Sequence, residues 1–408
     1  MARATVAVRM YNVGFGDSFL VTVRDGRETW RMLVDCGVHS QGRARPIEAV
    51  VDAIIDDLTA EAAPGQPPAL DVVVATHRHA DHISGYAYDR WSQVHVGEVW
   101  LPFVEDPHDK DAARIRASHQ LAAEQLDSVF RDRGARAPLE AMASAFALNA
   151  LGNDDSMDRL HGRGGRGFLN KPTLRFLPAL DPGRNVIDTR LSDVRVHVLG
   201  PPRDPAQLKV MDPPKNVEWL VRDARQLSDV DSAAPLFGGA FVAENATPAL
   251  HRQRTQLRLT RTSDVDSLVA AAAVLENALN NTSVFLLLDV RGVKLLFPGD
   301  AQQGAWDHVL DDPAKRRLLD DLAFYKIGHH GSHNATPRRF VTEILGDGKY
   351  AMLPWGLVRR WADTIPKKAL LTALAEHRTR LIRADSARKA PHVKVDGDLW
   401  SEVAFTAP

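Results

Sequence analysis

The sequence predicts an α/β fold in which sheets and helices form layers around an apolar core. Strand-like and helix-like segments alternate at both ends of the 408-residue chain. Residues 71–75 form a continuous β-branched run, which is typical of a strand buried on both faces. Hydrophobic residues make up 44% of the chain, the share expected of a globular protein with a substantial core.

The first hundred residues are predicted to form strands around one helix. Residues 12–17 read as a turn because glycine, asparagine and aspartate cluster there. Apolar residues recur with a period near 3.6 across residues 46–58, which predicts a helix. Alternating or continuous apolar runs predict strands at residues 5–10, 18–23, 30–34, 71–75 and 94–101.

The middle of the chain is predicted to be more irregular. Helical patterns cover residues 109–133, 138–151 and 265–279, and residues 152–170 read as a loop rich in glycine and arginine. A strand is expected at residues 194–199, followed by a stop at Gly200-Pro201-Pro202. Residues 283–290 and 293–297 predict a hairpin that turns at Arg291-Gly292.

The C-terminal part returns to alternating elements, which predicts one domain over residues 1–408 interrupted by two insertions. Strands are expected at residues 322–327, 350–353, 379–383 and 392–395, with a helix at 367–376. The core would comprise about residues 1–104, 185–202 and 278–408. The insertions would comprise about residues 105–184 and 203–277, with helical or irregular structure.

Charge and cysteine content exclude several classes of protein. A net charge of −1 argues against a strongly basic nucleic-acid coat or a polybasic membrane anchor. Cys36 is the single cysteine, so the chain cannot form an internal disulfide or a zinc ribbon. Neither a secretory leader nor a run of ~20 apolar residues is evident. The sequence therefore predicts a soluble, cytoplasmic protein without a membrane partner.

The strongest chemical signal is the heptapeptide Thr76-His77-Arg78-His79-Ala80-Asp81-His82, directly after the buried strand. Ligands of α/β folds lie at the carboxyl ends of such strands. His77 and His79, two residues apart in an extended segment, point to the same side and can share one metal ion, while Asp81 and His82 can reach a second. Imidazoles with a carboxylate suit Zn²⁺, Mn²⁺ or iron.

Three other predicted strands end in residues of the same chemistry. Asp35 and Asp300 each follow an apolar run beside a glycine, and a buried carboxylate there needs a hydrogen-bond partner or a metal ion. His329 and His330 follow a third apolar run. Four such strand ends, two of them rich in histidine, predict a metal centre.

These residues resemble a known family. Residues 77–82 look like the HxHxDH signature of the metallo-β-lactamase superfamily, and Asp35, Asp300 and the pair 329–330 follow in that family's order. The likeness is strongest to the metal-hydrolase domain of ComEC-type competence proteins and covers roughly residues 5–104, 190–202 and 278–356. The stretches that carry it are Val13-Gly14-Phe15-Gly16-Asp17-Ser18, Leu199-Gly200-Pro201-Pro202, Asn280-Asn281-Thr282-Ser283, Phe297-Pro298-Gly299-Asp300 and Gly328-His329-His330-Gly331-Ser332.

The resemblance implies an αββα sandwich, the metallo-β-lactamase fold, with a dinuclear site at one edge. It implies a first ion on His77, His79 and Asp300, and a second on Asp81, His82, Asp300 and His330. His329 would be a further ligand or face the substrate, and Asp35 would orient a metal-bound water or a histidine ligand.

One position departs from the family pattern. Gly200 stands where many members supply a third histidine to the first ion, and it offers no side chain. His197 is the nearest candidate, although its place on an alternating strand favours a structural role. The first site would then be weaker or completed by water.

The function expected from this site is metal-dependent hydrolysis. Two divalent ions, Zn²⁺ in the first place with Mn²⁺ as the alternative, would produce hydroxide at neutral pH. Asp81, Asp35 and His329 are the expected catalytic residues, and a phosphodiester of nucleic acid or a nucleotide is the expected substrate. The alternatives are an ester, lactone or amide hydrolase, and a metal-stabilised partner module in a multi-gene system. The sequence leaves the oligomeric state open.

Two further groups are candidate substrate contacts. Ser332 and His333 follow the last pair of histidines closely enough to touch substrate. Arg163 and Arg166 lie in the glycine-rich loop and could close on a phosphate backbone. The alternative for this loop is a surface role in which nearby aspartates neutralise the arginines.

Overall fold

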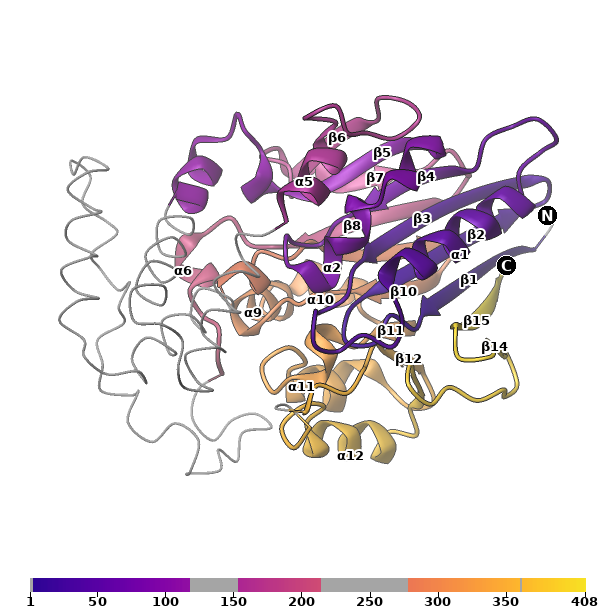
Figure 1. The fold of residues 1–408 in the computed structure, drawn as a ribbon. Helices are drawn as coiled ribbons and strands as arrows, with labels where there is room; N and C mark the ends of the chain where they lie inside the picture. The colour runs from indigo at the N-terminus through magenta and orange to yellow at the C-terminus, as the bar shows by residue number, and fades with distance from the viewer. Residues whose placement is uncertain (1–2, 118–152, 214–277, 360–361) are drawn as a thin grey trace. The chain divides into compact units, whose positions relative to one another are not determined.

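The computed structural model describes residues 3–117, 153–213, 278–359 and 362–408. Its contacts divide the chain into two compact units, of which the first comprises Met1–Phe103, Asn153–Trp219 and Asn280–Pro408. The described part of the second unit includes a helical stretch at residues 110–117. Both sheets that the described residues form, and the candidate site, belong to the first unit (Figure 1).

The first sheet combines an antiparallel half with a parallel half. β1, β2, β3, β14 and β15 pair antiparallel, whereas β3, β4, β5 and β6 pair parallel. In spatial order its strands are β14 (Val393–Asp396), β15 (Trp400–Ala407), β1 (Ala4–Tyr11), β2 (Ser18–Asp25), β3 (Glu28–Cys36), β4 (Ala69–Val74), β5 (His95–Pro102) and β6 (Thr173–Leu177).

The second sheet is also mixed. β10 to β13 pair parallel, and the hairpin of β9 and β10 joins them to the antiparallel strands β7 and β8. Its order is β13 (Arg380–Arg383), β12 (Tyr350–Leu353), β11 (Leu322–Lys326), β10 (Val293–Phe297), β9 (Phe285–Val290), β8 (Val194–Gly200) and β7 (Val186–Asp188).

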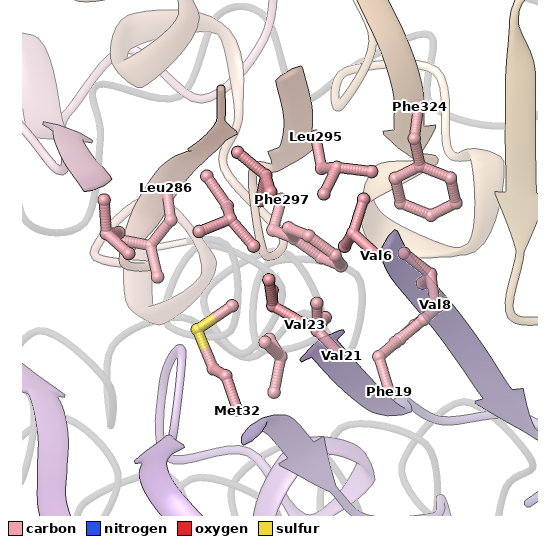
Figure 2. Close-up of a cluster of buried hydrophobic side chains, with 14 of the residues drawn as sticks. Val6, Val8, Phe19, Val21, Val23, Met32, Leu286, Leu295, Phe297 and Phe324 are labelled. Carbon is pink, nitrogen blue, oxygen red and sulfur yellow. The ribbon is translucent and has the colours of Figure 1, made fainter. Parts of the chain in front are cut away.

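The largest apolar cluster joins the two sheets. Alternate residues of each strand enter it because successive side chains of a strand point to opposite faces. Figure 2 shows side chains from both sheets meeting there, including Val6, Val8, Phe19, Val21, Val23 and Met32 of the first sheet and Leu286, Leu295, Phe297 and Phe324 of the second.

Helices cover the other face of each sheet. α1 (Ile47–Ala60) buries Val50, Val51, Ile54 and Ile55 in a cluster with residues of β3 and β4. α9 (Gln303–Leu310), α11 (Arg338–Phe340) and α12 (Lys368–Glu376) contribute to a third cluster with β9 to β12. The shorter helices are α2 (Ala80–Ile83), α5 (Asp154–His161), α6 (Pro205–Leu208) and α10 (Pro313–Leu318), with short 3₁₀ or π turns at Ser84–Ala87, Asp89–Gln93, Phe103–Glu105, Pro182–Asn185, Gly328–Gly331 and Val341–Leu345.

The mixed α/β class predicted from the sequence is confirmed, with two multistranded sheets and helices. The predicted hairpin is β9 and β10, and its turn residues Arg291 and Gly292 have φ angles of 50° and 88°. The predicted helix at residues 138–151, and most of those at 109–133 and 265–279, lie outside the described residues. None of the described helices has the length and hydropathy that crossing a membrane requires.

The structure contains several elements that were not predicted from the sequence, among them three strands and the short helices α2, α5, α6, α9, α10 and α11. β6, β7 and β15 were not expected, and β6 joins the first sheet beside β5 although it lies in the segment assigned to the first insertion. α5 replaces the first part of the predicted loop. It begins after Asn153, carries Asp154 and Asp155 in its first turn, and ends at Gly162 in the left-handed conformation. Only eight residues long, this helix offers too short an apolar pattern to be distinguished from a loop.

Candidate metal centre

The chemically active residues lie where several strands end. The motif at residues 76–82 follows β4, while Asp35 lies near the end of β3. Asp300 follows β10, and the histidine pair 329–330 follows β11. Parallel strands bring their carboxyl ends to one edge of a sheet, and a hydrogen bond from Val284 N to Thr76 O (2.9 Å) links the two sheets there.

One group of ligand atoms comes from both sheets. A nitrogen of His77, a nitrogen of His82 and a carboxylate oxygen of Asp300 lie within 4.8 Å of one another, and all three residues are buried. His82 Nε2 is 3.1 Å from Asp300 Oδ2. Zinc bonds of about 2.0–2.1 Å place two tetrahedral ligand atoms roughly 3.3 Å apart. The pair is therefore spaced as two ligands of one ion would be.

The remaining predicted ligands surround this group. His79 Nδ1 lies 2.9 Å from His77 Nε2, and His330 Nε2 lies 3.3 Å from Asp81 Oδ2. All six residues predicted to bind metal are thus brought together at one place. The structure does not divide them into two separate sets of ligands.

Three histidines have polar partners at Nδ1 outside the candidate ligand set, while their Nε2 atoms face other candidate ligands. His82 Nδ1 is 2.8 Å from Asp35 Oδ2, and His330 Nδ1 donates to Pro354 O at 2.8 Å. His77 Nδ1 lies 3.2 Å from the Ser283 hydroxyl. Metal-binding histidines use such partners on the second nitrogen to fix ring orientation and tautomer.

Several buried polar atoms of this cluster have no hydrogen-bond partner. They include His79 Nε2 and Asp81 Oδ1, whose residues are 2% and 7% exposed. An unpaired buried polar group costs about 1–3 kcal/mol, and a charged group costs more. Neutral imidazoles and carboxylates without hydrogen-bond partners are the donors that a divalent cation takes, so these residues fit a metal ion.

Burial and charge set the protonation of the ligands. Burial lowers the pKa of His79 and of His329 to about 4, and it lowers the pKa of His77 well below its usual value. These rings are therefore neutral at pH 7, as a metal ligand must be. Burial also lowers the pKa of His82, but Asp300, Asp17, Asp35 and Asp81 outweigh it and raise that pKa well above 6.5.

Backbone strain concentrates at the same place. Asp35, His329 and His330 have φ angles of 58°, 44° and 52°, in the left-handed region that side chains with a Cβ avoid. Each such residue costs on the order of 1–3 kcal/mol and persists where the surrounding structure holds it, which is common at functional sites. The left-handed backbone conformation at these three residues directs their side chains toward the cluster.

Glycines allow the strand ends to approach the histidine motif. A Cβ on Gly37 would lie 2.4 Å from Ala80 O and 2.5 Å from His82 N, and a Cβ on Gly16 would lie 2.3 Å from Gly37 O. No side chain fits at these distances. The end of β3 and the turn after β1 can therefore pack directly on the backbone of the motif.

Asp35 contacts the candidate ligand His82 but is not itself one of the three residues grouped within 4.8 Å. Its Oδ1 accepts from Thr76 N and its Oδ2 from the Thr76 hydroxyl, both at 2.7 Å. The same Oδ2 lies 2.8 Å from His82 Nδ1. Asp35 thus orients one ligand and fixes its tautomer, with Thr76 holding the carboxylate in place.

The contact between Asp35 and His82 leads to a testable expectation. Asp35→Asn should weaken divalent-metal affinity by about 10–100-fold, because the amide no longer holds His82 as a neutral ligand with Nε2 free. Competition with a fluorescent chelator measures this affinity. Asp188→Asn is the matched control, since Asp188 is 76% exposed and pairs with Arg195. An affinity in Asp35→Asn within threefold of wild type would contradict the assignment.

Sequence reasoning missed two buried residues of the cluster as site residues, Asp17 and Lys326. Asp17 lies in the turn between β1 and β2 and is 1% exposed. Lys326 is the last residue of β11, and its ammonium contacts both Asp17 and Asp300. In the sequence, Lys326 could have been singled out because it is a charged residue at the end of an apolar strand, two residues before Gly328 and its histidine pair.

His329 lies beside the cluster with one nitrogen unpaired. Its Nε2 is 3.4 Å from Asn280 Nδ2, and its Nδ1 has no hydrogen-bond partner. Asn280 is 1% exposed, and its side-chain oxygen has no partner either. The two side chains therefore present polar atoms that a substrate could use.

The candidate substrate contacts separate into two groups. The Ser332 hydroxyl donates to Asn334 Oδ1 at 3.1 Å, and His333 Nε2 lies 3.0 Å from Asp212 Oδ1. Arg166 pairs with Asp89 and Asp155, both at 3.1 Å, which matches the surface alternative for the loop, and Arg163 is exposed.

The departure from the family pattern is visible in the structure. Gly200 ends β8, and a Cβ built on it would meet Phe285 at 3.4 Å. His197 is half-buried on the same strand, where Asp289, Arg195 and Lys294 are the charged groups that act on it. None of these belongs to the histidine cluster.

Comparison of the chain with protein-family models and with curated proteins finds no match to either.

Proposed function

We propose that this protein is a metal-dependent hydrolase of the metallo-β-lactamase superfamily, similar to the ComEC-type domain, that cleaves a phosphodiester of nucleic acid or a nucleotide. The observation that carries the proposal is the convergence of His77 and His82, from the motif after β4, with Asp300, which follows β10, within 4.8 Å in a buried cluster. His79, Asp81 and His330 complete the donor set.

Charge balance in the cluster favours two divalent ions and an anionic substrate. When all are ionised, the buried carboxylates of Asp17, Asp35, Asp81 and Asp300 hold four negative charges beside the one positive charge of Lys326, and burial raises the pKa of Asp17. One divalent ion would leave one net negative charge, whereas two would leave one net positive charge. Buried charge is costly unless it is compensated. The net positive charge left by two ions suits a phosphodiester, which carries a single negative charge.

The protein's own residues would have distinct tasks in this reaction. Two divalent ions, when bound, supply a hydroxide nucleophile at neutral pH and polarise the scissile centre. Asp35 orients His82 through Nδ1, and Pro354 orients His330 in the same way. Asp81, which has one oxygen unpaired, would accept a proton, and His329, whose Nδ1 has no partner, would contact the substrate. Burial of the cluster excludes bulk water.

The proposal is tested by hydrolysis of bis(p-nitrophenyl) phosphate, and by nicking of DNA and RNA, with protein loaded with Zn²⁺ or Mn²⁺. Wild type should turn over the phosphodiester, and His79→Ala should lower kcat/KM by at least ~10³-fold, the scale on which electrostatic stabilisation of a transition state is lost. Asp188→Asn should match wild type. Activity of His79→Ala equal to wild type would exclude the cluster as the active site.

The same assay separates the alternatives. Faster turnover of p-nitrophenyl acetate or of a lactone panel than of phosphodiesters would assign the site to esters. Metal-loaded protein that turns over none of these substrates, but captures a protein partner stoichiometrically, would identify a metal-stabilised binding module.

A further inference from the structure

Lys326 is buried inside the candidate metal centre, where its ammonium contacts three oxygens. Its side chain is 3% exposed, and its ammonium donates to Gly299 O at 3.0 Å and to Asp300 Oδ1 at 3.1 Å and forms an ion pair with Asp17 Oδ2. Two backbone or carboxylate oxygens accept from this ammonium, and a second carboxylate, Asp17, lies in ion-pair contact with it. Lys326 is thus a fixed cation at the end of β11 rather than a free surface group.

This cation restricts how Asp300 can bind metal. Asp300 Oδ1 accepts from Lys326 Nζ and also from His329 N at 2.9 Å. Asp300 Oδ2 faces His82 Nε2 at 3.1 Å. One carboxylate oxygen is therefore saturated by two donors, and the other faces the ligand nitrogens.

The position of Asp17 relative to the histidines has a similar consequence. By distance alone, Asp17 could join His82 and His330 around an ion. The nitrogens that face Asp17 are, however, the Nδ1 atoms, at 3.7 Å for His82 and 3.8 Å for His330. These atoms already contact Asp35 and Pro354 O, so they carry the ring proton and cannot bind a metal ion. Asp17 lies on the side of the rings away from the ligand nitrogens.

We propose that Lys326 is a positioning residue that acts as a built-in cation of the metal centre: it pairs with Asp17, which keeps Asp17 out of the ligand set, and it holds Asp300 so that Oδ2 alone faces the ions. The inference rests on the proposed metal centre, and it assigns roles to two residues that the hydrolytic reaction does not itself require.

Counting bound metal tests this inference without any measurement of turnover. Lys326→Ala removes the ammonium from among three oxygens, the ligand type that Mn²⁺ accepts readily. This variant should bind one more Mn²⁺ per chain than wild type, and the double variant Lys326→Ala/Asp17→Asn should return to the wild-type count. Asp17→Asn alone should keep the wild-type count. Elemental analysis after equilibrium dialysis gives the counts, and circular dichroism verifies the fold.

Two results would overturn the inference. A folded Asp17→Asn protein that loses one Mn²⁺ would show that Asp17 is a ligand, and this variant decides the question even where Lys326→Ala fails to fold. A Lys326→Ala protein with the count and affinity of wild type would show that the ammonium does not act as a cation of the site. Wild type without bound metal would remove the metal centre and this inference together. Metal-loaded wild type that fails to hydrolyse phosphodiesters would leave the inference standing.

Discussion

Asp300→Asn is expected to lower kcat/KM for phosphodiester hydrolysis by at least ~10³-fold, equivalent to about 4 kcal/mol of transition-state stabilisation. The amide has the shape of the carboxylate, so its oxygen can still accept from Lys326 Nζ and His329 N, which contact Oδ1 in the native protein. At the position of Oδ2, opposite His82 Nε2, an NH₂ donor would replace a metal-binding oxygen. The variant therefore removes the ligand while it preserves the surrounding hydrogen bonds.

Two measurements together establish the cause of this loss. Initial rates with bis(p-nitrophenyl) phosphate give kcat/KM, and elemental analysis gives the metal bound at the same protein concentration. Asp188→Asn, which makes the same chemical change at an exposed surface pair, should retain both. Retention of kcat/KM within threefold in Asp300→Asn would show that Asp300 does not bind a catalytic ion.

The strand ends that form the cluster could be located from the sequence because their signal is local. Asp35 follows an apolar run directly, Asp300 and His330 follow one within three residues, and parallel strands bring such ends to one edge of a sheet. Contact between segments more than 200 residues apart, such as His82 with Asp300, then follows from the topology. The sequence of these short segments is therefore enough to predict which candidate metal ligands come together and at which edge of the sheets they lie.

The roles of Asp17 and Lys326 could not be predicted in the same way. Whether Asp17 binds metal depends on which nitrogen of His82 and His330 faces it, and this in turn depends on Asp35 and on the Pro354 carbonyl. The ring orientation of these histidines is determined by tertiary packing, and the spacing of residues in the sequence does not reveal it. A lysine at the end of an apolar strand is equally compatible with a solvated surface position.

The unpredicted strands reflect long-range pairing. β15 pairs with β1 along its whole length, from Ala4 opposite Ala407 to Tyr11 opposite Trp400. β6 pairs with β5 across a gap of about seventy residues in the chain. In both cases the partner strand, rather than a strong local pattern, selects the extended conformation, since strand propensity depends on the neighbours that a side chain meets.

Metal affinity is expected to strengthen as pH rises from 6 to 7, by up to tenfold when one proton is released per ion bound. In the metal-free protein, four carboxylates outweigh burial and raise the pKa of His82 well above 6.5. His82 is then protonated at pH 7, and an ion must displace that proton. Calorimetric titration in two buffers of different ionisation enthalpy measures the protons released.

The contribution of His82 to the stability of the metal-free protein should change with pH in the opposite direction. A histidine whose folded pKa is raised contributes stability that is fully present below its unfolded pKa of 6.5 and is lost as pH rises through the folded value. Bound metal opposes this loss of stability at high pH. When the free metal concentration is one hundred times Kd, binding adds about 2.7 kcal/mol to the free energy of unfolding. Chelation should therefore lower the melting temperature more at pH 8 than at pH 6. Equal shifts at both pH values would show that metal binding and the protonation of His82 are not linked.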